Sequence, residues 1–209
     1  MSEHYLPENY SAFVTQLASK YSMVDINTKL GTLGLGLSGE AGEIVNLVIL
    51  TPKSLDRQSA EEFRKKLADE LGDICWYVAF GAANVLENVS FNQLYDEMDP
   101  DYNNGDIYDV VSSCPELMAS CGSVADFIKK LIYHGKPFDL QAKNKLRDML
   151  KVVMKNVVWL GRVGCHKHIE DLLKINVAKL SDRYKSLSFT TEEFMAKEAA
   201  KTDDVPATL

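Results

Sequence analysis

Two pairs of acidic residues have the spacing of neighbours on one helix face. Glu40 and Glu43 lie three residues apart, and so do Glu70 and Asp73. Residues at positions i and i+3 of a helix point to the same side. Each pair lies in an otherwise apolar stretch, and the short connection between the two stretches favours antiparallel neighbouring helices. The sequence therefore predicts that four carboxylates converge.

Four carboxylates in one place repel one another unless a cation neutralises them. Oxygen ligands at this density are typical of Mg²⁺ or Mn²⁺, usually shared with substrate phosphates. We therefore predict a Mg²⁺ site, with Mn²⁺ as a substitute, whose ligands are Glu40, Glu43, Glu70 and Asp73. A di-iron site would need Glu-x-x-His motifs, and no histidine lies near either pair. A solvated acidic helix surface is the alternative for either pair alone.

Two other motifs match known binding loops in the wrong context. Residues 34–39 match the dinucleotide pattern GxGxxG, but this pattern works only between a strand and a helix of a parallel sheet. Small residues that allow close helix packing are the better interpretation. Residues 99–105 resemble a calcium-binding EF-hand loop. Gly105 is at loop position seven instead of six, and Val110 stands where the bidentate glutamate belongs, so we interpret the segment as a linker.

Helical spacing of apolar residues dominates the chain, and alternating β-branched runs are nearly absent. This pattern predicts an all-α protein. Leu67, Leu71, Ile74 and Val78, for example, form one apolar stripe. The expected helices cover residues 10–21 and 26–49, a segment capped by Ser59, a segment from Pro115 to about Gly135, a segment capped by Asp139 that reaches about Gly164, and residues 166–184.

The chain divides into a first helical unit (1–95) that carries the acids, a linker (96–110), a second helical unit (111–190) and a charged tail (191–209). Shifts of 79 or 80 residues align the two units, with Leu67 on Leu146 and Leu71 on Leu150. In this alignment the four acids are replaced by Ser120, Ser123, Met149 and Val152. The second unit is therefore a degenerate copy that lacks the metal ligands.

Composition restricts the classes of function. The 209 residues carry a net charge of −7, which argues against a protein that binds the phosphate backbone of nucleic acid. The four cysteines form no CxxC pair, the N-terminal residues lack an apolar signal core, and the longest mostly apolar run (74–86) is too short for a membrane span. These features predict a cytoplasmic protein with neither a membrane nor a nucleic acid as partner.

The two acidic motifs, Gly39–Glu43 and Glu70–Tyr77, resemble those of the MazG-like all-α nucleoside triphosphate pyrophosphohydrolases, a superfamily that includes the dimeric dUTPases. Residues 176–184 resemble the closing helix of that family, so the likeness covers about residues 10–185. It implies a MazG-like bundle in which metal-activated water attacks the α-phosphorus of a (d)NTP, releasing a monophosphate and pyrophosphate. The acids would be ligands, and one glutamate would also act as the base.

The resemblance also bears on substrate contacts. Tyr77 would reach a phosphate or the sugar, or else serve in the core. Residues 125–130 with His134 and Gly135 resemble the basic segment of the family, which the first unit lacks. Because family dimers can build one site from two subunits, this chain resembles a fused dimer. We therefore expect an intramolecular pseudo-dimer, monomeric or further paired as a homodimer, in which Lys130, Asn176 and Lys179 approach the nucleotide from the second unit.

Two alternatives stay open. The lysines could be solvated helix residues, and the chain could bind or sense a nucleotide on the same scaffold without hydrolysing it. A purely structural bundle would leave the clustered acids unexplained. Neither the preferred base nor the preferred sugar follows from the sequence.

Overall fold

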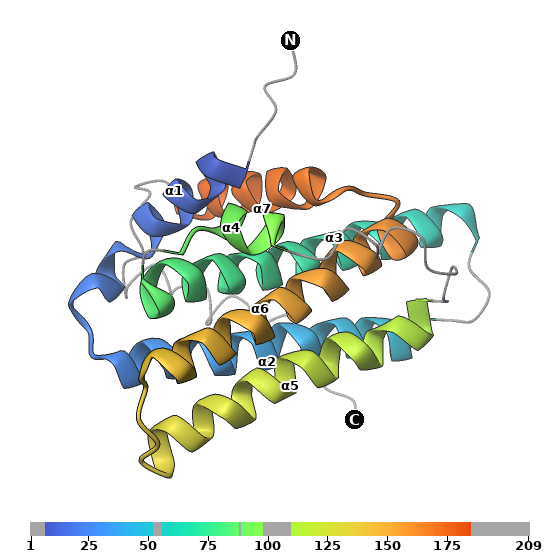
Figure 1. Cartoon of the computed structure of the whole chain (residues 1–209). Coiled ribbons are helices and arrows are strands. Elements are labelled where there is room, and N and C mark those ends of the chain that lie inside the picture. The colour runs from blue at the N-terminus through green and yellow to red at the C-terminus, as the bar shows by residue number, and fades with distance from the viewer. Residues whose placement is uncertain (1–6, 52–55, 88, 98–109, 185–209) are drawn as a thin grey trace, which may run out of the picture.

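The computed structural model describes residues 7–51, 56–87, 89–97 and 110–184, and all regular structure in these ranges is helical (Figure 1). This confirms the predicted all-α class. The helices are α1 (Pro7–Leu17), a 3-10 segment (Ser19–Met23), α2 (Ile26–Leu50), α3 (Arg57–Phe80), a π-helical turn (Gly81–Leu86), α4 (Phe91–Asp96), α5 (Val110–Tyr133), α6 (Leu140–Leu160), a second π-helical turn (Gly161–Cys165) and α7 (Ile169–Arg183).

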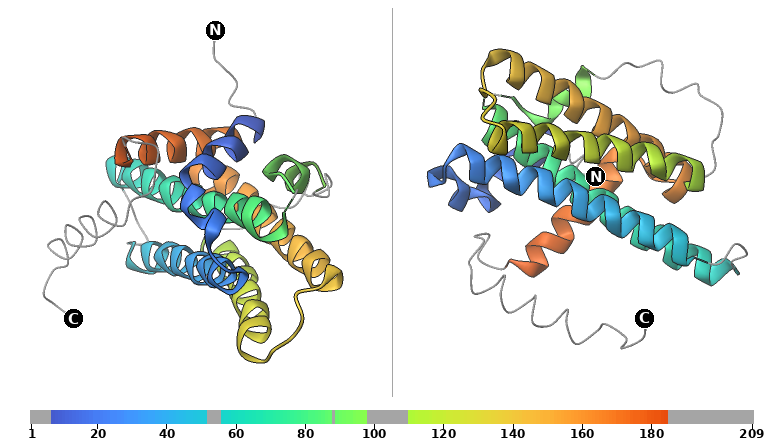
Figure 2. Two further views of the ribbon diagram at one scale, coloured as in Figure 1. Left: turned by 90° about the vertical axis from the view of Figure 1, so that its left-hand side faces the viewer. Right: turned by 90° about the horizontal axis from the view of Figure 1, so that it is seen from below.

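Four long helices form two antiparallel hairpins, α2 with α3 and α5 with α6. Helix α2 packs against both α3 and α5, and α7 packs against α3 (Figures 1 and 2). Helices α1 and α4 lie on the same side of α3 as α7, away from α2 and α5 (Figure 1). Helix α3 thus contacts α2 and α7, so residues on α3 can meet side chains from either of these helices.

Both hairpins bury apolar residues at matching positions, which we call the apolar frame. The predicted stripe on α3 is buried, and so are the residues 79 positions later on α6, namely Leu146, Leu150, Val153 and Val157. Each hairpin ends in a π-helical turn that is followed by a residue with positive φ, Glu87 and His166, again 79 positions apart. The division into two units stays a prediction, because residues 98–109, which hold most of the linker, and 185–209, which hold the tail, lie outside the described residues.

The predicted caps were right for one helix and wrong for another. Asp139 caps α6, where it accepts a hydrogen bond of 2.9 Å from the backbone N–H of Ala142. Ser59 does not cap α3. The cap is Asp56, whose carboxylate accepts a 2.7 Å bond from the N–H of Ser59, so the helix begins three residues earlier than the sequence suggested. Both residue types can cap a helix, and the residue pattern did not decide between them.

One further expectation about a helix end needs correction, and one short helix was not expected. Helix α5 begins at Val110, so Pro115 lies inside it and does not start it. Proline removes one backbone hydrogen bond, a loss that the early turns of a long, well-packed helix can absorb. Helix α4 was not expected, since it is only six residues long; Ser90 and Gln93 form a capping box at its start.

The glycine-rich motif lies within α2, so it forms no dinucleotide-binding loop. A Cβ on Gly36 would come within 2.0 Å of the Tyr77 ring, and one on Gly34 would come within 3.2 Å of Ile128. Close helix packing therefore accounts for these two glycines. By length and composition α2 could also cross a membrane, a property that core helices of soluble proteins and signal sequences share.

Candidate metal centre

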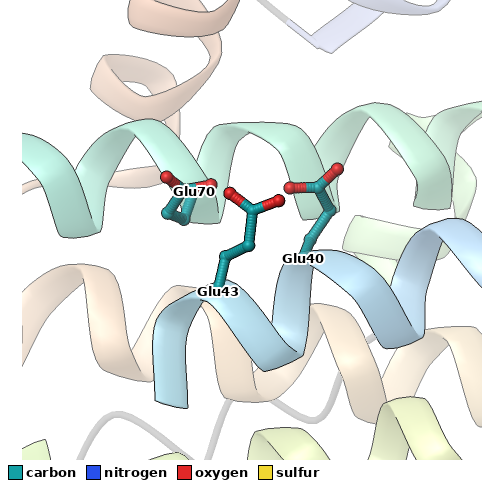
Figure 3. A group of neighbouring side chains, drawn as sticks. All are labelled: Glu40, Glu43 and Glu70. Atoms are coloured by element: carbon teal, nitrogen blue, oxygen red, sulfur yellow. The ribbon is translucent and has the colours of Figure 1, made fainter. Parts of the chain in front are cut away.

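Three of the four predicted acids come together between α2 and α3. Glu40 and Glu43 project from α2 toward α3, and Glu70 lies on α3 with its carboxylate beside that of Glu43 (Figure 3). Each residue offers one carboxylate oxygen, and these three oxygens all lie within 4.8 Å of one another. The i, i+3 spacing on α2 and the antiparallel hairpin together produce this geometry.

The cluster holds more negative charge than its surroundings stabilise. Burial raises the pKa of Glu40 to about 8, and the charges of Asp73, Glu43 and Glu70 contribute to the rise. The pKa of Glu70 is raised to about 7, again by burial first and then by Glu43 and Asp73. Such shifts mean that Glu40 and Glu70 retain protons near neutral pH unless a cation offsets the charge of the cluster.

Asp73 lies three residues beyond Glu70 on α3, and α7 holds both of its oxygens. The amide Nδ2 of Asn176 donates a hydrogen bond of 2.8 Å to Oδ1, and Nζ of Lys179 donates one of 2.5 Å to Oδ2. Lys179 also forms an ion pair of 2.9 Å with Asp69. Burial raises the pKa of Asp73 even though the ammonium of Lys179 opposes the rise.

Lys179 keeps its charge in this position. Burial alone lowers the pKa of its ammonium, but the negative charge of Asp73 and the hydrogen bonds to Asp73 and Asp69 outweigh that effect, so the net shift is upward. A permanent positive charge therefore lies beside the acidic cluster and fixes the orientation of Asp73.

A tyrosine that the sequence did not single out completes this network. The hydroxyl of Tyr10 donates a hydrogen bond of 2.8 Å to Oδ1 of Asn176, and both side chains are fully buried. Because a tyrosine hydroxyl must be the donor toward an amide oxygen, the Asn176 amide is oriented with its N–H toward Asp73. Gly72 permits the close approach of α7, since a Cβ there would lie 3.1 Å from the Cβ of Asn176.

The remaining predicted residues have different surroundings. The Tyr77 ring packs against Gly36 and stands edge-on to Trp76, with ring centroids 5.0 Å apart. Burial and the charge of Glu40 raise its pKa, so its hydroxyl lies near the acids in protonated form. Lys130 instead lies on α5 of the second hairpin, where it forms an ion pair of 2.5 Å with Asp126. No contact among the described residues joins Lys130 to the acids of α2 and α3.

The second hairpin has neutral hydrogen bonds where the first has acids. Ser120 and Asn156 follow Glu40 and Tyr77 by 80 and 79 residues. The Asn156 amide donates to the Ser120 hydroxyl at 3.1 Å and to the Glu116 carbonyl at 3.3 Å. The Asn156 amide nitrogen and the Ser120 hydroxyl thus bond within the second hairpin. Since Ser120, Ser123, Met149 and Val152 stand at the aligned positions, the four-residue acidic set has no copy on α5 and α6.

Known proteins share only a short stretch of sequence with this chain in the match found. No protein-family model matches the chain, and no solved structure matches it. The Gene 37 protein of Mycobacterium phage L5 is 46% identical over 50 residues, which make up 24% of this chain and 44% of the phage protein. That name states no activity.

Proposed function

We propose that this protein is a Mg²⁺-dependent nucleoside triphosphate pyrophosphohydrolase, which converts a (d)NTP and water to a (d)NMP and pyrophosphate. The observation that carries the proposal is the convergence of Glu40, Glu43 and Glu70 beside an Asp73 that α7 holds in place. The likeness of both acidic motifs to MazG-like enzymes supports the same reaction.

The donor set fits Mg²⁺. It consists of carboxylate oxygens, the ligands that this ion prefers, and the raised pKa values of Glu40 and Glu70 indicate uncompensated charge. Glu40, Glu43 and Glu70 would hold the ion, and Asp73 would complete the set. When bound, Mg²⁺ supplies positive charge that offsets the phosphate oxygens and acidifies water.

The side chains around the cluster orient one carboxylate and fill the space beside another. Asn176 and Lys179 hold the Asp73 carboxylate, and Tyr77 occupies the space between α2 and α3 next to Glu40. In the reaction, a water oxygen bonds to the α-phosphorus and the bond to the bridging oxygen breaks. Pyrophosphate leaves with that oxygen, and the proton of the water passes to a carboxylate of the cluster.

We also propose that the protein acts in the cytoplasm on a small-molecule substrate, with no nucleic acid or membrane partner. The net charge of −7 disfavours binding to a polyanion. Glu40 and Glu43 lie within α2, where a bilayer would penalise their charges. The two units would form an intramolecular pseudo-dimer, either monomeric or paired.

The test is pyrophosphate release from a panel of nucleoside triphosphates in Mg²⁺ and in EDTA. We expect turnover with Mg²⁺ alone, and we expect Glu40→Gln or Asp73→Asn to abolish it while circular dichroism shows unchanged helix content. Glu62→Gln is the matched control, since Glu62 is exposed near the start of α3. Activity in EDTA, or in both site variants, would contradict the proposal. Nucleotide binding without pyrophosphate release from any substrate would identify a binding protein instead.

The contribution of α7 can be tested separately. Asn176→Ala and Lys179→Ala should each lower kcat/KM by about 10- to 100-fold, the usual effect of removing a group that orients a metal ligand. Lys174→Ala on the same helix is the control, because Lys174 has no described contact with the acids. Wild-type kcat/KM in both site variants would exclude a role for α7 in the site.

A further inference from the structure

A hollow of about 470 Å³ lies on the second hairpin, away from the acids. Only α5, α6 and the turn between them line it, whereas the acidic cluster belongs to α2 and α3. Its lining includes Ser123 and Met149, which follow Glu43 and Glu70 by 80 and 79 residues. The hollow thus occupies, on α5 and α6, the position that corresponds to the metal centre, but with neutral residues in place of carboxylates.

The hollow is positively charged in a protein of net charge −7. Three lysines line it from three segments, Lys130 from α5, Lys136 from the turn and Lys145 from α6, against one acid, Asp126. Asp126 pairs with Lys130 at 2.5 Å and also with Lys129 at 2.6 Å. In the described part of the chain, no ion pair involves Lys136 or Lys145.

Apolar groups complete the lining. The Lys145 ammonium lies 5.1 Å from the centroid of the Phe127 ring, a cation–π contact that places its charge at the hollow. Met149 lines the same hollow. The volume falls within the range of small-molecule sites, roughly 300–1,000 Å³, and a few charged groups among apolar ones are typical of such sites.

We infer that this hollow is a second ligand site, one that binds the di- or triphosphate group of a small molecule through Lys130, Lys136 and Lys145. Lysines from three segments can contact several phosphate oxygens at once, which a single phosphate would not require. A long polyanion would meet the negative charge of the remaining surface, whereas a small one would not. Lys130 thereby binds phosphate here and not at the acidic cluster.

The phosphate group could come from free pyrophosphate or from a nucleotide, and calorimetry can distinguish them. Pyrophosphate, tripolyphosphate and ATP are titrated into the full chain in low-salt buffer containing EDTA. Without a divalent cation the carboxylates of the acidic cluster repel phosphate, and no Mg²⁺-dependent turnover consumes the ATP. We expect saturable binding that weakens with added salt. Binding of ATP alone would identify a nucleotide site, and equal binding of pyrophosphate would show that the phosphates suffice.

Variants locate the binding. The double variant Lys136→Gln/Lys145→Gln should weaken it by roughly tenfold or more, since two charge-assisted contacts are lost. Lys129→Gln is the matched control, because Lys129 lies on α5 and pairs with Asp126 but does not line the hollow. Glu40→Gln should leave binding unchanged. The inference is overturned if none of the three anions binds, if Lys129→Gln weakens binding as much as the double variant, or if Glu40→Gln abolishes it. None of these results depends on catalytic activity.

Discussion

Asn176 joins three helices through one amide group. It lies on α7, accepts a hydrogen bond from Tyr10 on α1 and donates one to Asp73 on α3. Its partners are 166 and 103 residues away in sequence. The orientation of a predicted metal ligand therefore depends on a contact that no local motif encodes.

Replacing Tyr10 with phenylalanine tests this network at the level of stability. The variant keeps the buried ring but leaves Oδ1 of Asn176 without its donor, and an unsatisfied buried acceptor costs about 1–3 kcal/mol. We expect Tyr10→Phe to lower the free energy of unfolding by that amount in urea denaturation. Tyr133→Phe is the control, because Tyr133 is 79% exposed, and its effect should stay within about 0.5 kcal/mol. Equal effects of the two variants would show that the Tyr10 bond contributes no stability.

The sequence predicted the part of the candidate site that depends on residue spacing within α2 and α3, but not the part that depends on the packing of other helices. The i, i+3 pairs and the hairpin identify Glu40, Glu43 and Glu70 as neighbours. The contacts of Lys179 with Asp69 and Asp73 follow from the packing of α7 on α3, which the sequence suggested only through the family resemblance. No sequence pattern pointed to Tyr10, since its role becomes visible only when its hydrogen-bond partner is known. Without that partner it resembles any buried tyrosine of a core.

At the scale of elements, the glycines of α2 have different roles. Gly36 faces the ring of Tyr77 on α3, and Gly34 faces Ile128 and Ala125 on α5. Gly39 has no atom within 4 Å of the Cβ position. Among the glycines of α2, only Gly34 and Gly36 therefore serve the close approach of the neighbouring helices.

Two matched substitutions separate these roles. Gly39→Ala should stabilise the protein by up to about 1 kcal/mol, because alanine favours a helix more than glycine does. Gly36→Ala carries the same helix benefit but pushes a methyl group into the Tyr77 ring, and such overpacking costs about 1–3 kcal/mol. We expect opposite signs in chemical denaturation. Stabilisation by both variants would mean that Tyr77 moves aside without cost.

The helices were more predictable than their ends. Apolar periodicity identified the long helices, and the α3 stripe is buried as expected, with Leu67, Leu71 and Ile74 at 0% exposure. Ends depend on single hydrogen bonds, for which neighbouring residues compete, so Asp56 and not Ser59 caps α3. Pro115 was a misleading start signal, because the packing of α5 on α2 and α6 lets the helix begin earlier, at Val110.

At the scale of the whole molecule, two hairpins with one apolar frame carry opposite charge. The acids lie between α2 and α3, and the lysine-lined hollow lies on α5 and α6. Helix α7 then returns to α3 and brings Lys179 to the acidic side. Folding of the metal-free protein thus forces carboxylates together with only part of their charge offset.

The stability of the metal-free protein should therefore fall as pH rises. The pKa of Glu40 is raised from 4.5 to about 8 and that of Glu70 from 4.5 to about 7 in the folded protein, so the folded state binds protons more tightly than the unfolded state. Their favourable contribution is complete below about pH 4.5 and is lost between there and about pH 8. In EDTA we expect Tm to drop across this window, by about 2–4 °C for each kcal/mol lost.

Mg²⁺ should reverse this loss, and the reversal should itself depend on pH. A cation that binds only the folded state raises Tm, and it competes with the protons that the carboxylates hold at low pH. Differential scanning calorimetry with millimolar Mg²⁺ should therefore show a larger rise in Tm near pH 8 than near pH 5. Glu40→Gln removes one titrating ligand, so it should flatten the pH dependence in EDTA and reduce the gain from Mg²⁺, whereas Glu62→Gln should change neither. A Tm in EDTA that is constant or increases from pH 5 to pH 8 would show that carboxylate repulsion does not destabilise the folded state. A Tm that Mg²⁺ leaves unchanged at pH 8 would show that the cluster does not bind the ion.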